Sequence, residues 1–153
     1  KQISLDTVIR EVIHKYAKIM IRRKILMQYE KTEVTVISDE KWLAFVLEQL
    51  LSNAVKYMSE GELTIEVWEE PQYIWLEIRD TGIGIRSEDI PRVFEKGYTG
   101  FNGHEDKRST GIGLYLCREV LQKLGHTIQI QSELGEGTTV KVGFSKDTID
   151  FRD

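Results

Sequence analysis

Two glycine-rich runs and one polar stripe on an apolar helix are the parts of this sequence whose residue types could do chemistry. The runs are Asp80-Thr81-Gly82-Ile83-Gly84 and Ser109-Thr110-Gly111-Ile112-Gly113-Leu114. The stripe consists of Gln49, Asn53, Lys56 and Tyr57, which follow one another at about one helical turn and therefore share a face. Together, two glycine turns and such a face could hold a purine, a metal ion and a phosphate chain.

The asparagine of the stripe admits two interpretations. Asn53 interrupts an otherwise apolar helix, and a buried amide without a partner costs about 1–3 kcal/mol. A bond to a neighbouring backbone group would satisfy it. Its carbonyl oxygen could instead ligate Mg²⁺, which takes hard oxygen ligands and is shared with phosphates. Lys56 could then neutralise a phosphate, although the ordinary position of a helical lysine is a solvated face.

Each glycine run also has a structural and a chemical interpretation. Asp80 could stabilise a tight turn, or it could accept a hydrogen bond from an adenine amino group that Gly82 and Gly84 allow to approach. The second run precedes a helix, where free amides and the helix dipole favour an anion by about 0.3–1 kcal/mol. The first run lacks the third glycine of the dinucleotide fingerprint, and no P-loop motif occurs.

The elements that position these residues follow from hydrophobic spacing. Helical spacing predicts helices over 5–27, over 39–57 and from Gly111 to just before Gly125. Alternating polarity predicts strands at 33–37, 62–69, 73–80, 127–133 and 138–145. In the polar stretch 85–110 only 88–95 could be a short helix, and so long a loop is usually a functional lid or disordered. Paired hairpins and amphipathic helices predict an α+β sandwich with the helices on one face of the sheet.

Composition limits the remaining possibilities. We expect one domain over 1–153 with a polar tail at 146–153, and the first residue, Lys1, indicates a piece of a longer protein. A net charge of −4 argues against nucleic-acid or membrane-surface binding. No apolar run approaches the ~20 residues of a membrane span. Cys117 is the only cysteine, which fits a reducing compartment, and three scattered histidines make a zinc site improbable.

In order and spacing, these motifs resemble the catalytic ATP-binding domain of bacterial sensor histidine kinases, the Bergerat or GHKL fold. Leu51-Ser52-Asn53-Ala54-Val55-Lys56-Tyr57 is similar to the N box, and the two glycine runs are similar to the G1 and G2 boxes. Pro91-Arg92-Val93-Phe94-Glu95 resembles the F box, and Gly135-Glu136-Gly137-Thr138 the last glycine box. The resemblance implies a two-layer α/β sandwich, with a mixed five-stranded sheet, three helices on one face and a long ATP lid at about 85–110.

By matched position, the resemblance assigns roles to individual residues. Asn53 and Gln49 would contact Mg²⁺, Lys56 a phosphate and Tyr57 the adenine. The adenine pocket would consist of Asp80, Gly82, Gly84 and Thr138. Phe94 would anchor the lid, and Thr110, Gly111, Gly113 and Leu114 would face the triphosphate. A basic lid residue would contact the phosphates, and Lys96, Lys107 and Arg108 are equal candidates.

The departures from the family pattern concern the reaction. Relatives that hydrolyse ATP place a glutamate base four residues before the asparagine, where this chain has Gln49, which takes no proton near neutral pH. Glu48 is about 100° away on the helix. The phosphoacceptor motif is also missing, since His14 lacks its sequence context. The resemblance therefore implies transfer of the γ-phosphoryl group of ATP to a histidine on a separate dimerisation domain.

The wider expectations follow from the same resemblance. The parent would be a homodimeric, membrane-anchored kinase with this domain in the cytoplasm, and it would serve a response regulator. The fragment alone would be monomeric. Gln49 and the run from Glu95 to Phe101 are similar to kinases that sense cell-envelope antibiotics in Gram-positive bacteria. The alternatives are a non-catalytic nucleotide-sensing module and, disfavoured by Gln49, an ATP hydrolase.

Overall fold

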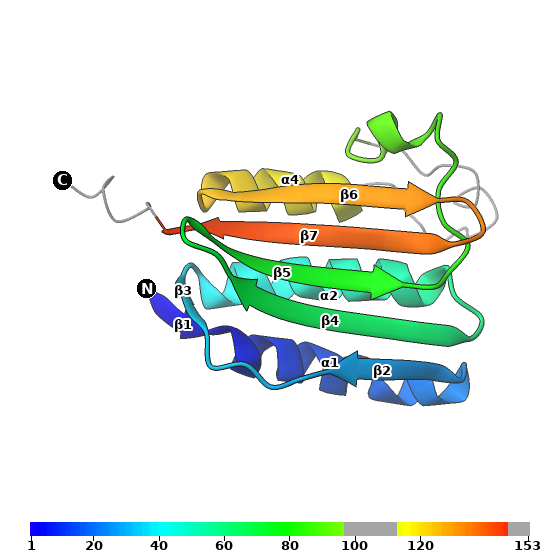
Figure 1. The fold of residues 1–153 in the computed structure, drawn as a ribbon, viewed down its shortest axis with the longest axis horizontal. Helices are drawn as coiled ribbons and strands as arrows, with labels where there is room; N and C mark the ends of the chain where they lie inside the picture. The colour runs from blue at the N-terminus through cyan, green and yellow to red at the C-terminus, as the bar shows by residue number, and fades with distance from the viewer. Residues whose placement is uncertain (97–112, 147–153) are drawn as a thin grey trace.

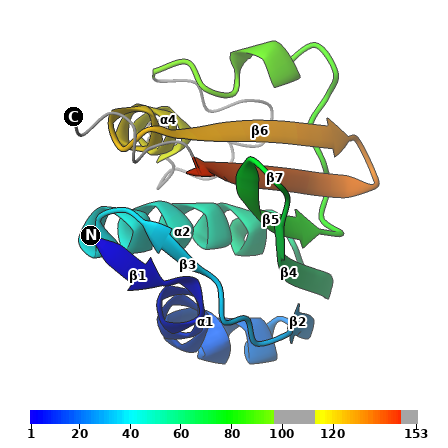
Figure 2. The same cartoon turned by 60° about the vertical axis from the view of Figure 1, so that its left-hand side comes forward.

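A computed structural model describes residues 1–96 and 113–146. Within these residues, three helices lie side by side against one face of a sheet: α1 (Leu5–Arg22), α2 (Glu40–Lys56) and α4 (Gly113–Lys123) (Figures 1 and 2). Side chains cap the first two helices. Ser4 Oγ accepts the Thr7 amide of α1 at 3.3 Å, and Asp39 Oδ1 accepts the Trp42 amide of α2 at 3.0 Å.

The main sheet of the described residues has five strands in the order β2-β4-β5-β7-β6. Their bounds are Ile25–Tyr29 (β2), Gly61–Glu69 (β4), Tyr73–Asp80 (β5), His126–Glu133 (β6) and Gly137–Ser145 (β7). β2 pairs with β4 in parallel, whereas all other neighbours are antiparallel. This arrangement confirms the predicted α+β sandwich with a mixed five-stranded sheet and three helices on one face.

The predicted helix over 5–27 is wrong beyond Arg22. Lys24 adopts a left-handed conformation (φ 60°), which ends the helix, and the chain continues as β2. Along β2 the side chains alternate, so that Ile25 is buried and Leu26 is 56% exposed. The residues at the end of the predicted helix are therefore the edge strand of the sheet.

Two shorter predicted elements form only in part. Of the predicted strand 33–37, only β3 (Thr35–Ile37) forms, and it pairs with β1 (Gln2–Ser4) in a separate two-stranded sheet. Of the segment 88–95, only the single 3-10 turn η1 (Ile90–Arg92) is helical.

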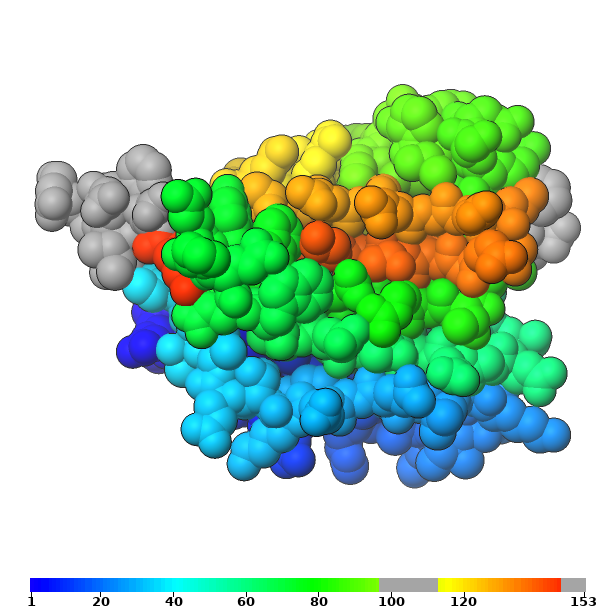
Figure 3. Space-filling model, in the orientation of Figure 1, coloured from blue at the N-terminus to red at the C-terminus, as the bar shows by residue number. Residues whose placement is uncertain are grey.

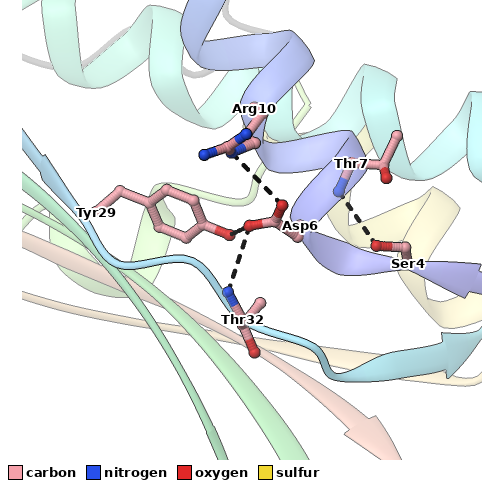
Figure 4. A network of polar contacts seen from close by, with 6 residues as sticks. All are labelled: Ser4, Asp6, Thr7, Arg10, Tyr29 and Thr32. Atoms are coloured by element: carbon pink, nitrogen blue, oxygen red, sulfur yellow. Dashed lines mark hydrogen bonds and ion pairs between the residues drawn. The ribbon is translucent and has the colours of Figure 1, made fainter.

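The buried carboxylate of Asp6 connects the start of α1 with the end of β2 and the chain that follows it (Figure 4). Asp6 accepts hydrogen bonds from the Tyr29 hydroxyl and from the Thr32 amide, and it pairs with Arg10 at 3.5 Å. The bond from Tyr29 is the main reason that the pKa of Asp6 lies below its usual value. Burial, together with the same bond, raises the pKa of Tyr29. These contacts hold β2 against α1.

The hydrophobic core lies between the helices and the sheet. Its fully buried side chains come from both layers and include Leu5, Leu43, Leu51, Leu63, Leu76 and Leu121. No helix of residues 1–96 or 113–146 covers the other face of the sheet, and β4, β5, β7 and β6 lie next to one another across it (Figure 3). No helix within the described residues is long and apolar enough to span a bilayer.

Candidate functional site

The predicted site residues that the structure describes gather at one end of the sandwich, the right-hand end in Figure 1. There α2 and β5 end, α4 begins, and the turn between β6 and β7 lies beside them. Lys107, Arg108, Thr110 and Gly111 lie outside the described residues. Most of the remaining candidates divide into a group around Asp80 and a group around Asn53, while Phe94, Lys96 and Leu114 belong to neither.

Asp80, the last residue of β5, joins two neighbouring segments through one oxygen. Its Oδ1 accepts the amide of Gly82 at 2.8 Å and the amide of Thr138 at 3.2 Å. Burial raises the pKa of Asp80, while the two amide bonds act against that rise. Both bonds end on Oδ1, and residues 1–96 and 113–146 donate no hydrogen bond to Oδ2. This second oxygen can therefore accept a hydrogen bond from a ligand.

The glycine turn after Asp80 lies directly against other backbone segments. Gly84 has a left-handed conformation (φ 77°), and a Cβ added there would lie 2.1 Å from the carbonyl oxygen of Glu133. A Cβ on Gly82 would lie 2.8 Å from the carbonyl oxygen of Tyr57. Between them, Ile83 donates its amide to the Tyr57 carbonyl at 3.3 Å. Glycine is required at Gly84 because the turn leaves no room for a side chain.

Gly137 completes this wall of the site, although sequence reasoning assigned it no role. Its φ is 126°, and an added Cβ would lie 2.0 Å from the carbonyl oxygen of Asp80. The signal in the sequence was the Gly135-Glu136-Gly137 spacing between two predicted strands. The structure shows that Gly137 lets β7 begin against the end of β5, which brings Thr138 opposite Asp80.

The second group lies where α2 faces the start of α4. A Cβ added at Gly113 would lie 3.1 Å from Oε1 of Gln49 and 4.0 Å from Nδ2 of Asn53. Both amide side chains therefore lie beside the first turn of α4, whose backbone N–H groups have no partners within the helix. Two amide oxygens suit a hard divalent cation. A side chain at position 113 would crowd Gln49, so the glycine leaves room for the amide side chains of α2.

The carboxylate next to Gln49 in the sequence is engaged elsewhere. Glu48 pairs with Lys15 of α1 at 2.8 Å. This direction agrees with its position about 100° around the helix from Gln49. It is therefore held between α1 and α2, whereas Gln49 and Asn53 face α4.

Lys56 and Tyr57 follow at the end of α2. The Lys56 ammonium lies 5.7 Å from the centre of the Tyr57 ring, and both side chains are half-buried. The Tyr57 carbonyl holds the turn after Asp80 through the Ile83 amide. The end of α2 thus connects the two groups of site residues.

Two residues that precede the segment 97–112 contact side chains of α4, the helix that follows it. The Phe94 ring lies 5.3 Å from the Arg118 guanidinium, and the Lys96 ammonium lies 5.9 Å from the centre of the Tyr115 ring. Leu114 packs against the hydrophobic core. Of the three candidate phosphate contacts, only Lys96 is within the described residues.

The two histidines that the structure describes belong to neither group of site residues. His14 is exposed on α1. His126 is buried, shares a 2.9 Å hydrogen bond with Ser38 and packs against the Phe144 ring. Burial lowers the pKa of His126 to about 4, so the ring is neutral near pH 7.

Residues 38–148 match the family described as histidine kinase-, DNA gyrase B-, and HSP90-like ATPase. Among curated proteins, the chain is 40% identical over 148 residues to the sensor histidine kinase YxdK of Bacillus subtilis (strain 168), covering 93% of this chain and 45% of YxdK. It is 42% identical over 118 residues to the sensor protein BceS of the same strain, covering 77% and 35%. The chain thus spans less than half the length of these relatives.

Solved structures show the same fold. The catalytic domain of the histidine kinase ThkA superimposes with a TM-score of 0.80 at 19% identity, covering 95% of this chain and 97% of that one. The mycobacterial sensor histidine kinase MprB gives a TM-score of 0.77 at 22% identity, covering 95% and 97%. At these identities the likeness concerns the fold alone.

Proposed function

The chain belongs to the histidine kinase-, DNA gyrase B- and HSP90-like ATPase family, and from this premise we propose that it binds ATP with Mg²⁺ and donates the γ-phosphoryl group to a histidine. The acceptor histidine lies on a separate dimerisation domain of the same kinase. The parent is a homodimeric sensor kinase anchored in the bacterial membrane, with this single domain (1–153) in the cytoplasm, and its phosphoryl group passes to a response regulator.

The two groups of site residues would hold the two ends of the nucleotide. Asp80 Oδ2 accepts a hydrogen bond from the adenine amino group, and Tyr57 packs beside the base. Gly82, Gly84 and Thr138 complete the base pocket. At the other end, Asn53 and Gln49 offer amide oxygens to Mg²⁺, and Lys56 neutralises a phosphate. The triphosphate faces the start of α4, with Thr110, Gly111, Gly113 and Leu114.

Phosphoryl transfer needs positioning and charge neutralisation more than covalent help from the protein. Bound Mg²⁺ supplies neutralisation of the negative charge on the phosphates. The amides at the start of α4 add a partial positive charge. Phe94 anchors the lid, whose closure excludes water, and Lys96, Lys107 or Arg108 supplies a further positive charge.

One observation favours transfer to histidine over hydrolysis: the side chain beside Gly113 is Gln49, an amide, while Glu48 is held by Lys15. Hydrolysis benefits from a general base that takes a proton from water, and an amide cannot do so. Imidazole is already a nucleophile, so transfer to a histidine needs no such base. Among the described residues, no carboxylate lies within 4 Å of the position that a Cβ at Gly113 would take.

The test is to mix the chain with Mg²⁺, ATP labelled at the γ position, and a separately made histidine-bearing dimerisation domain. Label on that domain that is acid-labile and base-stable supports the kinase. Steady release of phosphate without the acceptor supports a hydrolase instead. Binding of ATP with neither result supports a nucleotide-sensing module.

A matched pair of variants connects this test to the site. Asn53→Asp is expected to reduce transfer, because it changes the charge and geometry of the metal ligand. Gln122→Glu makes the same amide-to-carboxylate change at an exposed position of α4 and is expected to have no effect. Equal activity of both variants would remove Asn53 from the metal site.

A further inference from the structure

Ser132 of β6 connects three parts of the pocket wall through a single hydroxyl group. Its Oγ lies 2.8 Å from the amide nitrogen of Ile85, 2.9 Å from the carbonyl oxygen of Gly137 and 2.8 Å from Oγ1 of Thr138. No local pattern in the sequence marks Ser132. A serine in a predicted strand carries no local signal, and the contacts arise from strand register.

The register aligns Ser132 with the residue that recognises the base. Ser132 lies directly opposite Thr138, and Thr138 lies directly opposite Asp80. Directly opposite residues of adjacent strands point to the same face of a sheet. The side chains of Ser132, Thr138 and Asp80 therefore form one row across β6, β7 and β5.

The protons available at Ser132 and its three partners determine the direction of each hydrogen bond. The Ile85 amide can only donate, and the Gly137 carbonyl can only accept. The one proton of Ser132 therefore goes to Gly137. The bond between Ser132 and Thr138 must then use the proton of Thr138, so that Thr138 Oγ1 offers only lone pairs to any other neighbour.

The row thus offers two acceptors on directly opposite residues, Thr138 Oγ1 and the second carboxylate oxygen of Asp80. A 6-amino group, as in adenine, carries two N–H donors that match such a pair. A 6-carbonyl group, as in hypoxanthine or guanine, is an acceptor and would face two acceptors. A threonine hydroxyl that could turn freely would relieve this mismatch by donating to the carbonyl.

We propose that Ser132 is a positioning residue that sets the purine specificity of the site, by holding the Thr138 hydroxyl as an acceptor toward a 6-amino purine. The inference rests on the proposed function, since it takes the pocket at Asp80 as the site of the base. It goes further by assigning discrimination at the 6-position to a residue that does not touch the nucleotide.

The test measures the dissociation constants of ATP and of inosine triphosphate, each with Mg²⁺, by calorimetry on the wild-type chain and on Ser132→Ala. The two nucleotides differ only at the 6-position and the adjacent ring nitrogen. Wild type should prefer ATP. In Ser132→Ala the preference should fall about fivefold, the effect of one hydrogen bond that the freed Thr138 hydroxyl gives to the carbonyl.

A purely structural role for Ser132 predicts a different result. Loss of its bonds to Ile85 and Gly137 would then weaken both nucleotides equally, and an unchanged ratio would overturn the inference. Thr64→Val is the matched control, because it removes a hydroxyl hydrogen bond to Gln28 elsewhere on the same sheet. Its ratio should equal that of wild type.

A second variant, Thr138→Val, tests the acceptor that Ser132 is proposed to hold, and it can be measured even if Ser132→Ala does not fold. Thr138→Val should weaken ATP more than inosine triphosphate, because it removes an acceptor that only the 6-amino purine uses. Adding Ser132→Ala to Thr138→Val should leave the ratio unchanged. A further fall, or equal weakening of both nucleotides by Thr138→Val, contradicts the inference.

The result for wild type separates this inference from the function on which it rests. A wild-type chain that binds neither nucleotide refutes the proposed function, and the inference fails with it. A wild-type chain that prefers ATP, with a ratio that neither variant alters, refutes the role of Ser132 alone.

Discussion

Asp80→Asn is the substitution that most sharply separates the structural from the recognition role of the carboxylate. Oδ1 of Asp80 accepts two backbone amides, from Gly82 and Thr138. The carbonyl oxygen of asparagine can accept both. Its amino group replaces Oδ2, the oxygen that we propose accepts the adenine amino group, and thus turns an acceptor into a donor.

The expected magnitudes follow from this division. The free energy of unfolding of Asp80→Asn should fall by at most about 1 kcal/mol, since both amide bonds persist. Binding of ATP should weaken about 10- to 100-fold, because an unmatched polar group in a partly buried site costs about 1–3 kcal/mol. Asp80→Ala removes the acceptor for both amides and should in addition lower the free energy of unfolding by about 2 kcal/mol.

Urea denaturation and calorimetry with ATP and Mg²⁺ measure the two effects separately. Wild-type affinity in Asp80→Asn would refute the contact between Asp80 and the base. If Asp80→Asn were as unstable as Asp80→Ala, the assignment of both amide bonds to one replaceable oxygen would be wrong.

Three further predictions test other parts of the structure. Gly84→Ala should lower the free energy of unfolding, measured in urea, by at least about 2 kcal/mol more than Gly135→Ala. Both glycines are left-handed, but only a Cβ at position 84 would meet a backbone atom, at 2.1 Å. Equal effects of the two substitutions would contradict the packing of this turn. Gln49→Glu should raise steady phosphate release from ATP at least about tenfold by adding a general base beside Gly113, whereas Gln122→Glu should not; no increase would count against the position of Gln49. Burial lowers the pKa of His126 to about 4, so the unfolded chain takes up a proton on this histidine first as the pH falls below about 6.5. Between pH 7.5 and 5 the free energy of unfolding of the wild type should therefore fall by about 2 kcal/mol more than that of His126→Gln. An equal fall for the two proteins, measured by urea denaturation at both pH values, would refute a buried neutral ring.

Local patterns predicted the elements whose partners are close in sequence. The hairpin of β4 and β5 alternates cleanly, and α2 has a long apolar face. β2 was missed because Ile25 to Tyr29 continues the apolar spacing of the preceding helix, and only Arg23 and the left-handed Lys24 separate the two elements. Its parallel partner, β4, is more than thirty residues away, and no local pattern reports such a pairing.

Residues of the candidate site could be proposed from the sequence where their type marks them, but not where strand register does. Asn53, Asp80 and the glycines stand out because an amide in an apolar helix, a carboxylate at a strand end and paired glycines are unusual in those positions. Ser132 does not stand out, because the role that we propose for it comes from lying opposite Thr138, which lies opposite Asp80. Glu48 and Gln49 are neighbours in sequence, and the ion pair of Glu48 with Lys15 distinguishes them.

The most direct measurement is an NMR titration of the ¹⁵N-labelled chain with ATP, first with Mg²⁺ and then with Mn²⁺ in its place. Our account predicts that Mn²⁺ broadens the side-chain amides of Asn53 and Gln49 and the backbone amide of Gly113 most strongly. The amides of Gly82 and Thr138 should shift on binding of the base without being broadened as much. Strongest broadening at any other part of the chain, or shifts that leave Gly82 and Thr138 unchanged, would contradict a single nucleotide held between Asp80 and Asn53.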